Sequence, residues 1–265
     1  AVAAGTFAFS GCQKEGCTDS TATNYDSDAK SDDGTCVYGE ETSTVTLHAH
    51  SKMGTADFAY NTQVTNWEGR KMEFTTAQMY VSNFVFHDDE GGMHAVDDSY
   101  FLLQPETMMY EVGEIPNGHY HGFGFRVGLD STANHSDPAS WPSEHALSSN
   151  NPDHAFWSWN SGYIFVKAEG NSLDATDSTF AYHLGGFAGP NKSSMEMESH
   201  FHNHVLAINP SGNPQVHFKV DVMKLFDGTN TLSVAQENSV RMPGEKAKNI
   251  AVNFSEAFAF DHIHD

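Results

Sequence analysis

Short apolar bursts separated by turn residues constrain the fold of this chain more than any other feature of its sequence. Each burst is rich in Val, Ile, Phe or Tyr and is bounded by Gly, Asn, Asp or Ser, which is typical of β-strands. Such segments fall at residues 43–50, 78–88, 99–104, 121–130, 162–170, 179–187, 202–208, 216–226 and 249–255. They predict an all-β fold, namely an antiparallel β-sandwich of jelly-roll or immunoglobulin-like type, with helix limited to single turns near 142–149 and 220–228.

The first 41 residues differ in composition from the remainder, and they divide the chain into three expected parts. Residues 1–11 are small or apolar and stop at a cysteine, so we interpret them as the remnant of a lipoprotein signal peptide and expect a lipid on Cys12. Residues 12–41 are rich in Asp and Ser and have almost no aliphatic side chains, which predicts a stalk without a core of its own. Residues 42–265 are expected to form the β-sandwich domain.

The three cysteines of the chain fit this division. With Cys12 acylated, Cys17 and Cys36 would remain to form a disulfide in an oxidising compartment and would give the stalk its shape. No later run is long and apolar enough to span a bilayer, so membrane contact is expected through the lipid only. We therefore expect an exported, outer-membrane lipoprotein that faces the periplasm or the cell surface.

A formal net charge of −22 excludes the classes of protein that bind nucleic acid or anionic membrane surfaces, because both partners would be repelled. Small cations would be attracted, although an acidic surface also serves solubility alone. The stalk contains an acidic cluster of Asp26, Asp28, Asp32 and Asp33. Its spacing does not match a known calcium loop, so calcium is not expected there.

The spacing His-x-His recurs along the chain. Nine of the 16 histidines follow it, namely His48, His50, His119, His121, His200, His202, His204, His262 and His264. Residues two apart in a strand point to the same face, so each pair presents two imidazoles together. Val45, Leu47 and Ala49 should then face the core opposite the first pair. Neutral imidazole is a good ligand for copper and zinc.

The pairs at the two ends of the domain are the first candidates for metal ligands, namely His48, His50, His262 and His264. The ends of a domain's chain often lie close together, so the strands that carry these pairs could be neighbours. Four imidazoles would then meet at one place and could hold a metal ion. The alternative is that the histidines are merely exposed on a structural or adhesive surface module without metal.

The segment 200–204 carries three histidines at the same spacing, His200, His202 and His204. If they lie on one strand, their imidazoles share a face and can complete a trigonal metal site. This would be either a second site or the other half of the first. The pair at 119–121 ranks lowest, because its segment looks like a turn that enters a strand.

Trp157 and Trp159 share a face by the same strand rule, and on physical grounds alone they fit an aromatic core cluster. Five motifs occur in the order and approximate spacing of the MbnP-like copper-binding proteins, namely "AQMYVSNFVF", "FRVGLDS", "WSWNSGYIFVKAEG", "FAYHLGGF" and "AFDHIHD". The chain resembles this family, named for methanobactin-operon partners and similar to CorA-type proteins, over about residues 44–265. It lacks the Cys that the typical proteobacterial form carries after "HLG", so it is more similar to a Bacteroidota-like branch.

The resemblance implies an exported β-sandwich that binds copper through histidines together with a tryptophan oxidised to kynurenine. It makes Trp157 and Trp159 candidates for the modified or site-lining aromatic residue, with His183 as a second-tier ligand, while Trp67 and Trp141 remain open. The oxidation is attributed in the family to a partner dihaem protein of the peroxidase type. This chain has no haem-attachment Cys-x-x-Cys-His motif, so such an oxidation would need that separate partner.

Together these observations predict an extracytoplasmic protein that binds copper, or else zinc, for acquisition or buffering. Its mechanism would be coordination, and no pair of nucleophile and base stands out, so an enzyme is not expected. Besides the adhesive module, a carbohydrate-binding sandwich that stacks sugars on Trp67, Trp141 or Trp157 is an alternative.

Overall fold

A computed structural model describes residues 14–157, 162–172 and 177–264 of the chain. The chain forms two compact units, Ala1–Glu41 and Thr42–Asp265. No helix among the described residues is long and apolar enough to cross a membrane. Cys12 and Trp159 lie outside the described residues, so lipidation of the first and modification of the second stay predictions.

The small unit is held together by one disulfide and by side chains that close turns. The disulfide joins Cys17 and Cys36, as predicted. The carboxylate of Asp33 accepts hydrogen bonds from the backbone N–H and the hydroxyl of the threonine two residues later. The carboxylate of Asp26 pairs with the ammonium group of Lys14. Within the acidic cluster, Asp33 therefore stabilises a turn and Asp26 forms an ion pair.

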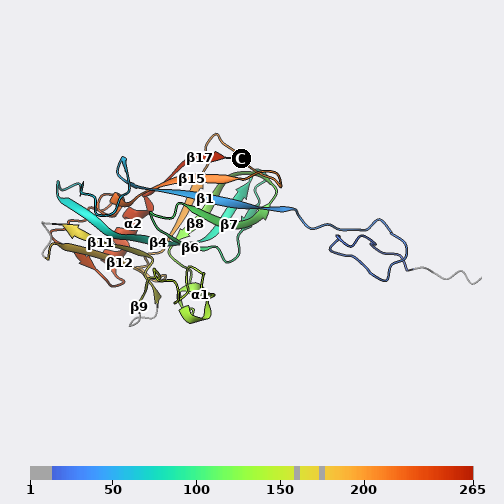
Figure 1. The fold of residues 1–265 in the computed structure, drawn as a ribbon, viewed down its shortest axis with the longest axis horizontal. Helices are drawn as coiled ribbons and strands as arrows, with labels where there is room; N and C mark the ends of the chain where they lie inside the picture. Colours follow the sequence, from blue (N-terminus) through green and yellow to red (C-terminus); the bar gives the residue numbers. More distant parts are fainter. Residues whose placement is uncertain (1–13, 158–161, 173–176, 265) are drawn as a thin grey trace, which may run out of the picture. The chain divides into compact units, whose positions relative to one another are not determined.

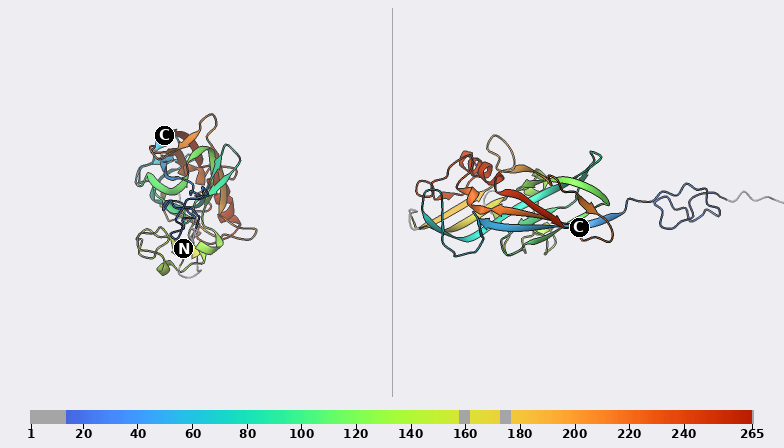
Figure 2. Two further views of the ribbon diagram at one scale, coloured as in Figure 1. Left: turned by 90° about the vertical axis from the view of Figure 1, so that its right-hand side faces the viewer. Right: turned by 90° about the horizontal axis from the view of Figure 1, so that it is seen from above.

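The large unit contains two strongly curled, mixed β-sheets (Figure 1). The five-stranded sheet has the order β17–β15–β1–β2, and β7 also pairs with β1. Its strands are β1 Thr42–Met53, β2 Ala56–Asp57, β7 Met109–Pro116, β15 Gln215–Asp221 and β17 Phe258–His264. Figure 2 shows β1, β15 and β17 again side by side, in blue, orange and red.

The ten-stranded sheet has the order β13–β8–β4–β11–β12–β16, with four short strands attached to β8 or β4. Its strands are β3 Val64–Thr65, β4 Lys71–Asp88, β5 Met93–Ala95, β6 Tyr100–Leu103, β8 Gly118–Val127, β11 Val166–Ser172, β12 Thr179–Leu184, β13 Met195–His200, β14 Leu206–Ile208 and β16 Ser239–Val240. β9 Phe156–Trp157 and β10 Gly162–Tyr163 form a separate two-stranded sheet. The helices are α1 Ser131–Asn134 and α2 Glu245–Ser255, with 3-10 helices η1 Pro138–Ser140 and η2 Val222–Leu225.

The all-β prediction is confirmed for most of this unit, and most strand pairs are antiparallel as predicted, but two pairs are parallel and make both large sheets mixed. β1 runs parallel to β15, and β12 runs parallel to β16. The partners in each pair are far apart along the chain, so no hairpin sets their relative direction. Alternation of apolar residues reports which face of a strand is buried, and it carries no information about direction.

The core combines aliphatic and aromatic side chains from both sheets. On β1, Val45, Leu47 and Ala49 are buried, which confirms the predicted inward face. Between β4 and β8, Phe84 stacks on Phe125 with ring centroids 5.4 Å apart. Burying an apolar side chain contributes about 1.5–3 kcal/mol, so these residues hold β1 with its polar face turned away from the core.

Residues 249–255 were predicted to form a strand, but they form the second half of helix α2. Four buried residues lie on one face of this helix, at spacings of three and four residues, namely Ala247, Ile250, Ala251 and Phe254. The preceding Glu-Lys-Ala-Lys run favours helix. The seven residues 249–255 alone are too short to reveal the helical spacing of apolar residues. The single turn predicted near 220–228 is present as η2, whereas 142–149 forms turns without helix.

Candidate metal centre

Five histidines gather on three adjacent strands of the five-stranded sheet. His48 and His50 come from β1, His217 from β15, and His262 and His264 from β17. β15 lies between the other two strands, and the register places His48, His217 and His262 at one level. The expectation that the first and last strands are direct neighbours is therefore wrong, because β15 lies between them and pairs with both.

A β-bulge in β17 turns the terminal histidine pair toward His217. Every second residue of a regular strand points to the same face, so without a bulge four residues of β17 would share one face, namely Phe258, Phe260, His262 and His264. The register shifts at Asp261, so the two phenylalanines and Ile263 pack against the core. The two histidines are thereby left on the opposite face, which also carries His217.

The first group of ligands, called the β1 triad, consists of His48, His50 and His217. Nδ1 of His217 lies 2.9 Å from Nδ1 of His48 and 3.2 Å from Nε2 of His50. Two nitrogens that bind one ion at about 2.0–2.1 Å are about 2.8–3.4 Å apart, so these atoms are already at ligand spacing. All three ligand atoms lie within 4.8 Å of one another, so the triad can hold an ion.

The second group, called the β17 triad, consists of His217, His262 and His264, whose ligand atoms also lie within 4.8 Å of one another. Nε2 of His262 is 3.2 Å from Nε2 of His264. The carboxylate of Asp261 lies 3.2 Å from Nδ1 of His262, which favours a ring proton on that nitrogen. The lone pair of His262 is then on Nε2, the nitrogen that faces His264, where it can bind a metal ion. The two triads together are called the five-histidine centre.

His217 is shared by both triads and is the most buried of the five, with 6% of its surface exposed. Burial, followed by the nearby imidazoles of His262 and His48, lowers the pKa of His217 to about 4. Burial also lowers the pKa of His48. Nε2 of His217 is buried and has no hydrogen-bond partner among the described residues. A neutral, desolvated ring nitrogen is prepared for coordination, and an all-imidazole donor set fits copper or zinc.

The segment 200–204 does not form the predicted three-histidine face. β13 ends at His200, and His202 lies in a turn with a φ of 53°. The alternation that would align three imidazoles therefore stops at the first of them. None of the three belongs to either triad. The rings of His202 and His204 instead approach Phe260, with centroids 6.3 and 6.0 Å away.

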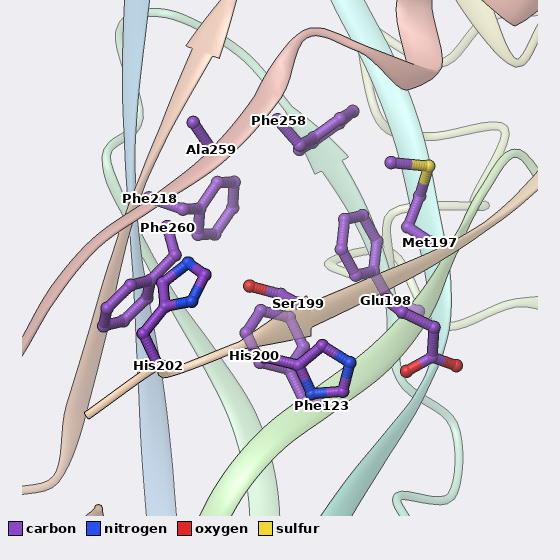
Figure 3. A pocket seen from close by; sticks show the side chains of 11 residues that line it. Phe123, Met197, Glu198, Ser199, His200, His202, Phe218, Phe258, Ala259 and Phe260 are labelled. Atoms are coloured by element: carbon purple, nitrogen blue, oxygen red, sulfur yellow. The ribbon is translucent and has the colours of Figure 1, made fainter. Parts of the chain in front are cut away.

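A pocket of about 330 Å³ opens beside this segment, between β13 and β17 (Figure 3). Its lining is mostly aromatic and consists of Phe123, Phe125, Met197, Glu198, Ser199, His200, His202, Phe218, Phe258, Ala259 and Phe260. In Figure 3 the ring of His202 lies beside Phe260, while Glu198 and His200 lie next to each other on β13. Phe218 directly follows His217 in β15, but no histidine of either triad lines this pocket.

His183, the second-tier ligand candidate, lies on β12 of the ten-stranded sheet and belongs to neither triad. Its Nε2 is 2.7 Å from a carboxylate oxygen of Glu169 on β11. Burial lowers the pKa of His183, and the hydrogen bond to Glu169 opposes that effect. The pair therefore joins two adjacent strands.

The described tryptophans differ in exposure. Trp157 is 5% exposed and packs against Gly185, where a Cβ atom would lie 2.5 Å from the indole ring. Trp141 stacks on the ring of His145 with centroids 4.2 Å apart. Trp67 is the most exposed of them, with 46% of its surface accessible, and its Nε1 donates a hydrogen bond to a backbone carbonyl.

His217 is the ligand candidate that sequence reasoning missed, because it is not part of a His-x-His pair. Its segment was expected to be a strand, and Val216, Phe218 and Val220 are buried on the inner face. Alternation alone therefore puts His217 on the outer face, where a histidine usually has no special role. Only the place of β15 between β1 and β17 distinguishes it, and that place comes from the fold.

The family model described as MbnP matches residues 42–243 of the chain. The chain belongs to the MbnP family. Its fold is similar to the solved structure of MbnP from Methylosinus trichosporium, with a TM-score of 0.54 and 15% sequence identity, covering 78% of this chain and 83% of that one. A comparison with curated proteins found no match. The predicted resemblance is thus confirmed, and membership of the MbnP family implies a copper-associated protein.

The extent of the MbnP match separates the two triads. His48, His50 and His217 all lie within residues 42–243, whereas β17 Phe258–His264 lies beyond them. The β1 triad is therefore contained in the family-matched part of the chain, and the β17 triad depends on the terminal strand as well.

Proposed function

We propose that this MbnP-family protein binds copper in the five-histidine centre and serves in copper acquisition or buffering outside the cytoplasm. The observation that carries the proposal is the β1 triad, in which two imidazole nitrogens already lie 2.9 and 3.2 Å from Nδ1 of His217. The family is copper-associated, and copper stands above zinc in the affinity order for nitrogen ligands.

The side chains of the centre bind the ion by coordination, and the fold prepares them for it. The lowered pKa values of His217 and His48 keep both rings neutral at neutral pH, so the ion does not compete with a proton for their lone pairs. β1 and β15 hold both residues at one level, so little ordering is needed when the ion arrives. The net charge of −22 raises the local concentration of cations.

We also propose that the protein acts after export, tethered by a lipid on Cys12. The disulfide between Cys17 and Cys36 supports an oxidising compartment, because disulfides rarely persist in the cytosol. Intact mass of the protein purified from its native host measures the lipid. Elemental analysis of the same sample reports its metal content. An unmodified Cys12 in mature protein from that host would contradict the tether.

Competition against a chromogenic copper chelator tests copper binding on the full-length protein. We expect the double variant His48→Ala/His50→Ala to bind copper more weakly by roughly 100-fold or more, because the β1 triad loses two ligands and even outer-shell changes cost 10–100-fold. The matched control is His119→Ala/His121→Ala, which removes a pair of the same spacing from β8. Equal copper affinity in the wild type and in His48→Ala/His50→Ala would contradict the proposal.

A further inference from the structure

We propose that the five-histidine centre has positions for two metal ions, one in each triad, and that His217 gives one ring nitrogen to each ion. This inference rests on the proposed function, since both positions require a protein that binds metal. Its starting point is that the ligand atoms form two separate groups within 4.8 Å and share only His217, without merging into one group of five.

The ring of His217 stands between the two histidine pairs. Its centroid lies 4.4 and 5.4 Å from those of His48 and His50. It lies 4.2 and 4.9 Å from those of His262 and His264. Nitrogens that bind one ion are at most about 4 Å apart, and no group of three ligands among the described residues includes histidines of both pairs. An ion can therefore bind on either side of this ring, with His217 as the third ligand.

An imidazole has two ring nitrogens, and the proposal gives one of them to each position. Nδ1 is the atom that lies 2.9 and 3.2 Å from the nitrogens of the β1 pair. Nε2, at another edge of the ring, is buried and lacks a hydrogen-bond partner among the residues that the structure describes. When both nitrogens bind metal, the ring releases its N–H proton to solvent and becomes an imidazolate bridge. No electron is transferred, so each metal keeps its oxidation state.

On the β17 side, the other two donors lie close enough together to bind one ion. Asp261 lies beside Nδ1 of His262 and favours a proton there, and Nε2 of His262 lies 3.2 Å from Nε2 of His264. Closing this triad requires a rotation of the His262 ring, which stacks on His217 with 17° between the planes. Because His264 is exposed and the rotation is needed, we expect this position to take the second, more weakly held ion.

Titration of the full-length protein with Cu(II), followed by electron paramagnetic resonance, tests the shared ligand. We expect two equivalents to remain bound after ions held by surface carboxylates are removed with glycine as a weak competitor. The integrated spin signal should rise during the first equivalent and fall as the second binds. The reason is that an imidazolate bridge couples the unpaired electrons of the two copper ions.

Paired variants assign the two equivalents. His262→Ala/His264→Ala should lose only the second equivalent, and the remaining copper should keep its full spin signal. His119→Ala/His121→Ala should keep both equivalents and the loss of signal. Far-UV circular dichroism checks the fold of each variant. The spin signal of the wild-type protein reports the coupling between the two copper ions without any variant. The proposal can therefore still be tested if a variant fails to fold.

Each outcome decides the question. A single equivalent in the wild type, lost in His48→Ala/His50→Ala, would overturn the second position and leave the proposed function intact. Two equivalents with full, uncoupled spin signals would overturn the sharing of His217. A protein that binds no copper would overturn both proposals.

Discussion

The β1 pair and the segment 200–204 repeat the same His-x-His spacing, but the fold places them differently. His48 and His50 lie in the middle of the 12-residue strand β1 and share a face. β13 ends at His200, and the histidines that follow leave the strand. Spacing therefore aligns imidazoles only where a regular strand continues through it.

The neighbouring strand makes a second difference between these two regions. His48 lies level with His217 on β15, whereas His200 lies level with Gly122 on β8. Gly122 has no side chain, and a Cβ atom there would lie 3.2 Å from Nδ1 of His200. A histidine pair thus becomes a three-ligand group when the adjacent strand supplies the third ligand at the same level.

The variant His217→Ala removes this third ligand and should have the largest effect. Both triads lose a ligand, so copper affinity is expected to fall by roughly 100-fold or more, about 3 kcal/mol. Competition with a copper chelator measures the loss, with His200→Ala as the control from the other region. If His217→Ala kept wild-type affinity, the adjacent strand would not be what distinguishes the two regions.

The metal-free protein should lose stability as the pH falls from about 6.5 to about 4. The pKa of His217 is about 4 in the folded protein, but that of an unfolded histidine is about 6.5, so the unfolded state binds more protons in this range. The full loss from this residue is roughly 3 kcal/mol, reached below the folded pKa.

Urea unfolding at neutral and acidic pH measures this loss. His217→Gln should flatten the difference between the two conditions, because glutamine does not titrate. His202→Gln, from the segment 200–204, should leave the difference in place. The same pH dependence in His217→Gln as in the wild type would contradict the expectation.

Asp261→Asn should weaken the β17 position about tenfold and spare the β1 position, because a neutral amide holds the Nδ1 proton of His262 less firmly. Asp261 also pairs with Lys219, so Lys219→Gln controls for the loss of that ion pair. Calorimetric titration resolves the two positions. An equal loss at both positions would show that Asp261 acts on the sheet as a whole and not on the orientation of His262.

The β1 side of the centre was largely predictable, because the alternation of apolar and polar residues can be read from consecutive positions of one strand. Val45, Leu47 and Ala49 were expected to be buried and are, which puts His48 and His50 together on the other face. The ordered motifs predicted the family, and the match over residues 42–243 confirms it.

The rest of the centre depends on contacts between distant segments. No local pattern shows that β15 runs parallel to β1 or lies between β1 and β17. His217 is therefore indistinguishable in the sequence from an exposed histidine. The bulge at Asp261 is hidden for the same reason, since it is defined by the register against β15.

Replacing all three histidines of the segment 200–204 with alanine should have the smallest effect on copper binding, less than about threefold. None of them belongs to either triad, and all three are exposed, so the free energy of unfolding should change by only about 0.5 kcal/mol per site. Copper competition and urea unfolding measure the two quantities on one preparation. A loss of affinity as large as that of His48→Ala/His50→Ala would mean that His-x-His spacing makes a copper site in a turn as well as in a strand. The distinction between the two regions would then fail, and the pocket beside His200 and His202 would have to be considered part of the copper site.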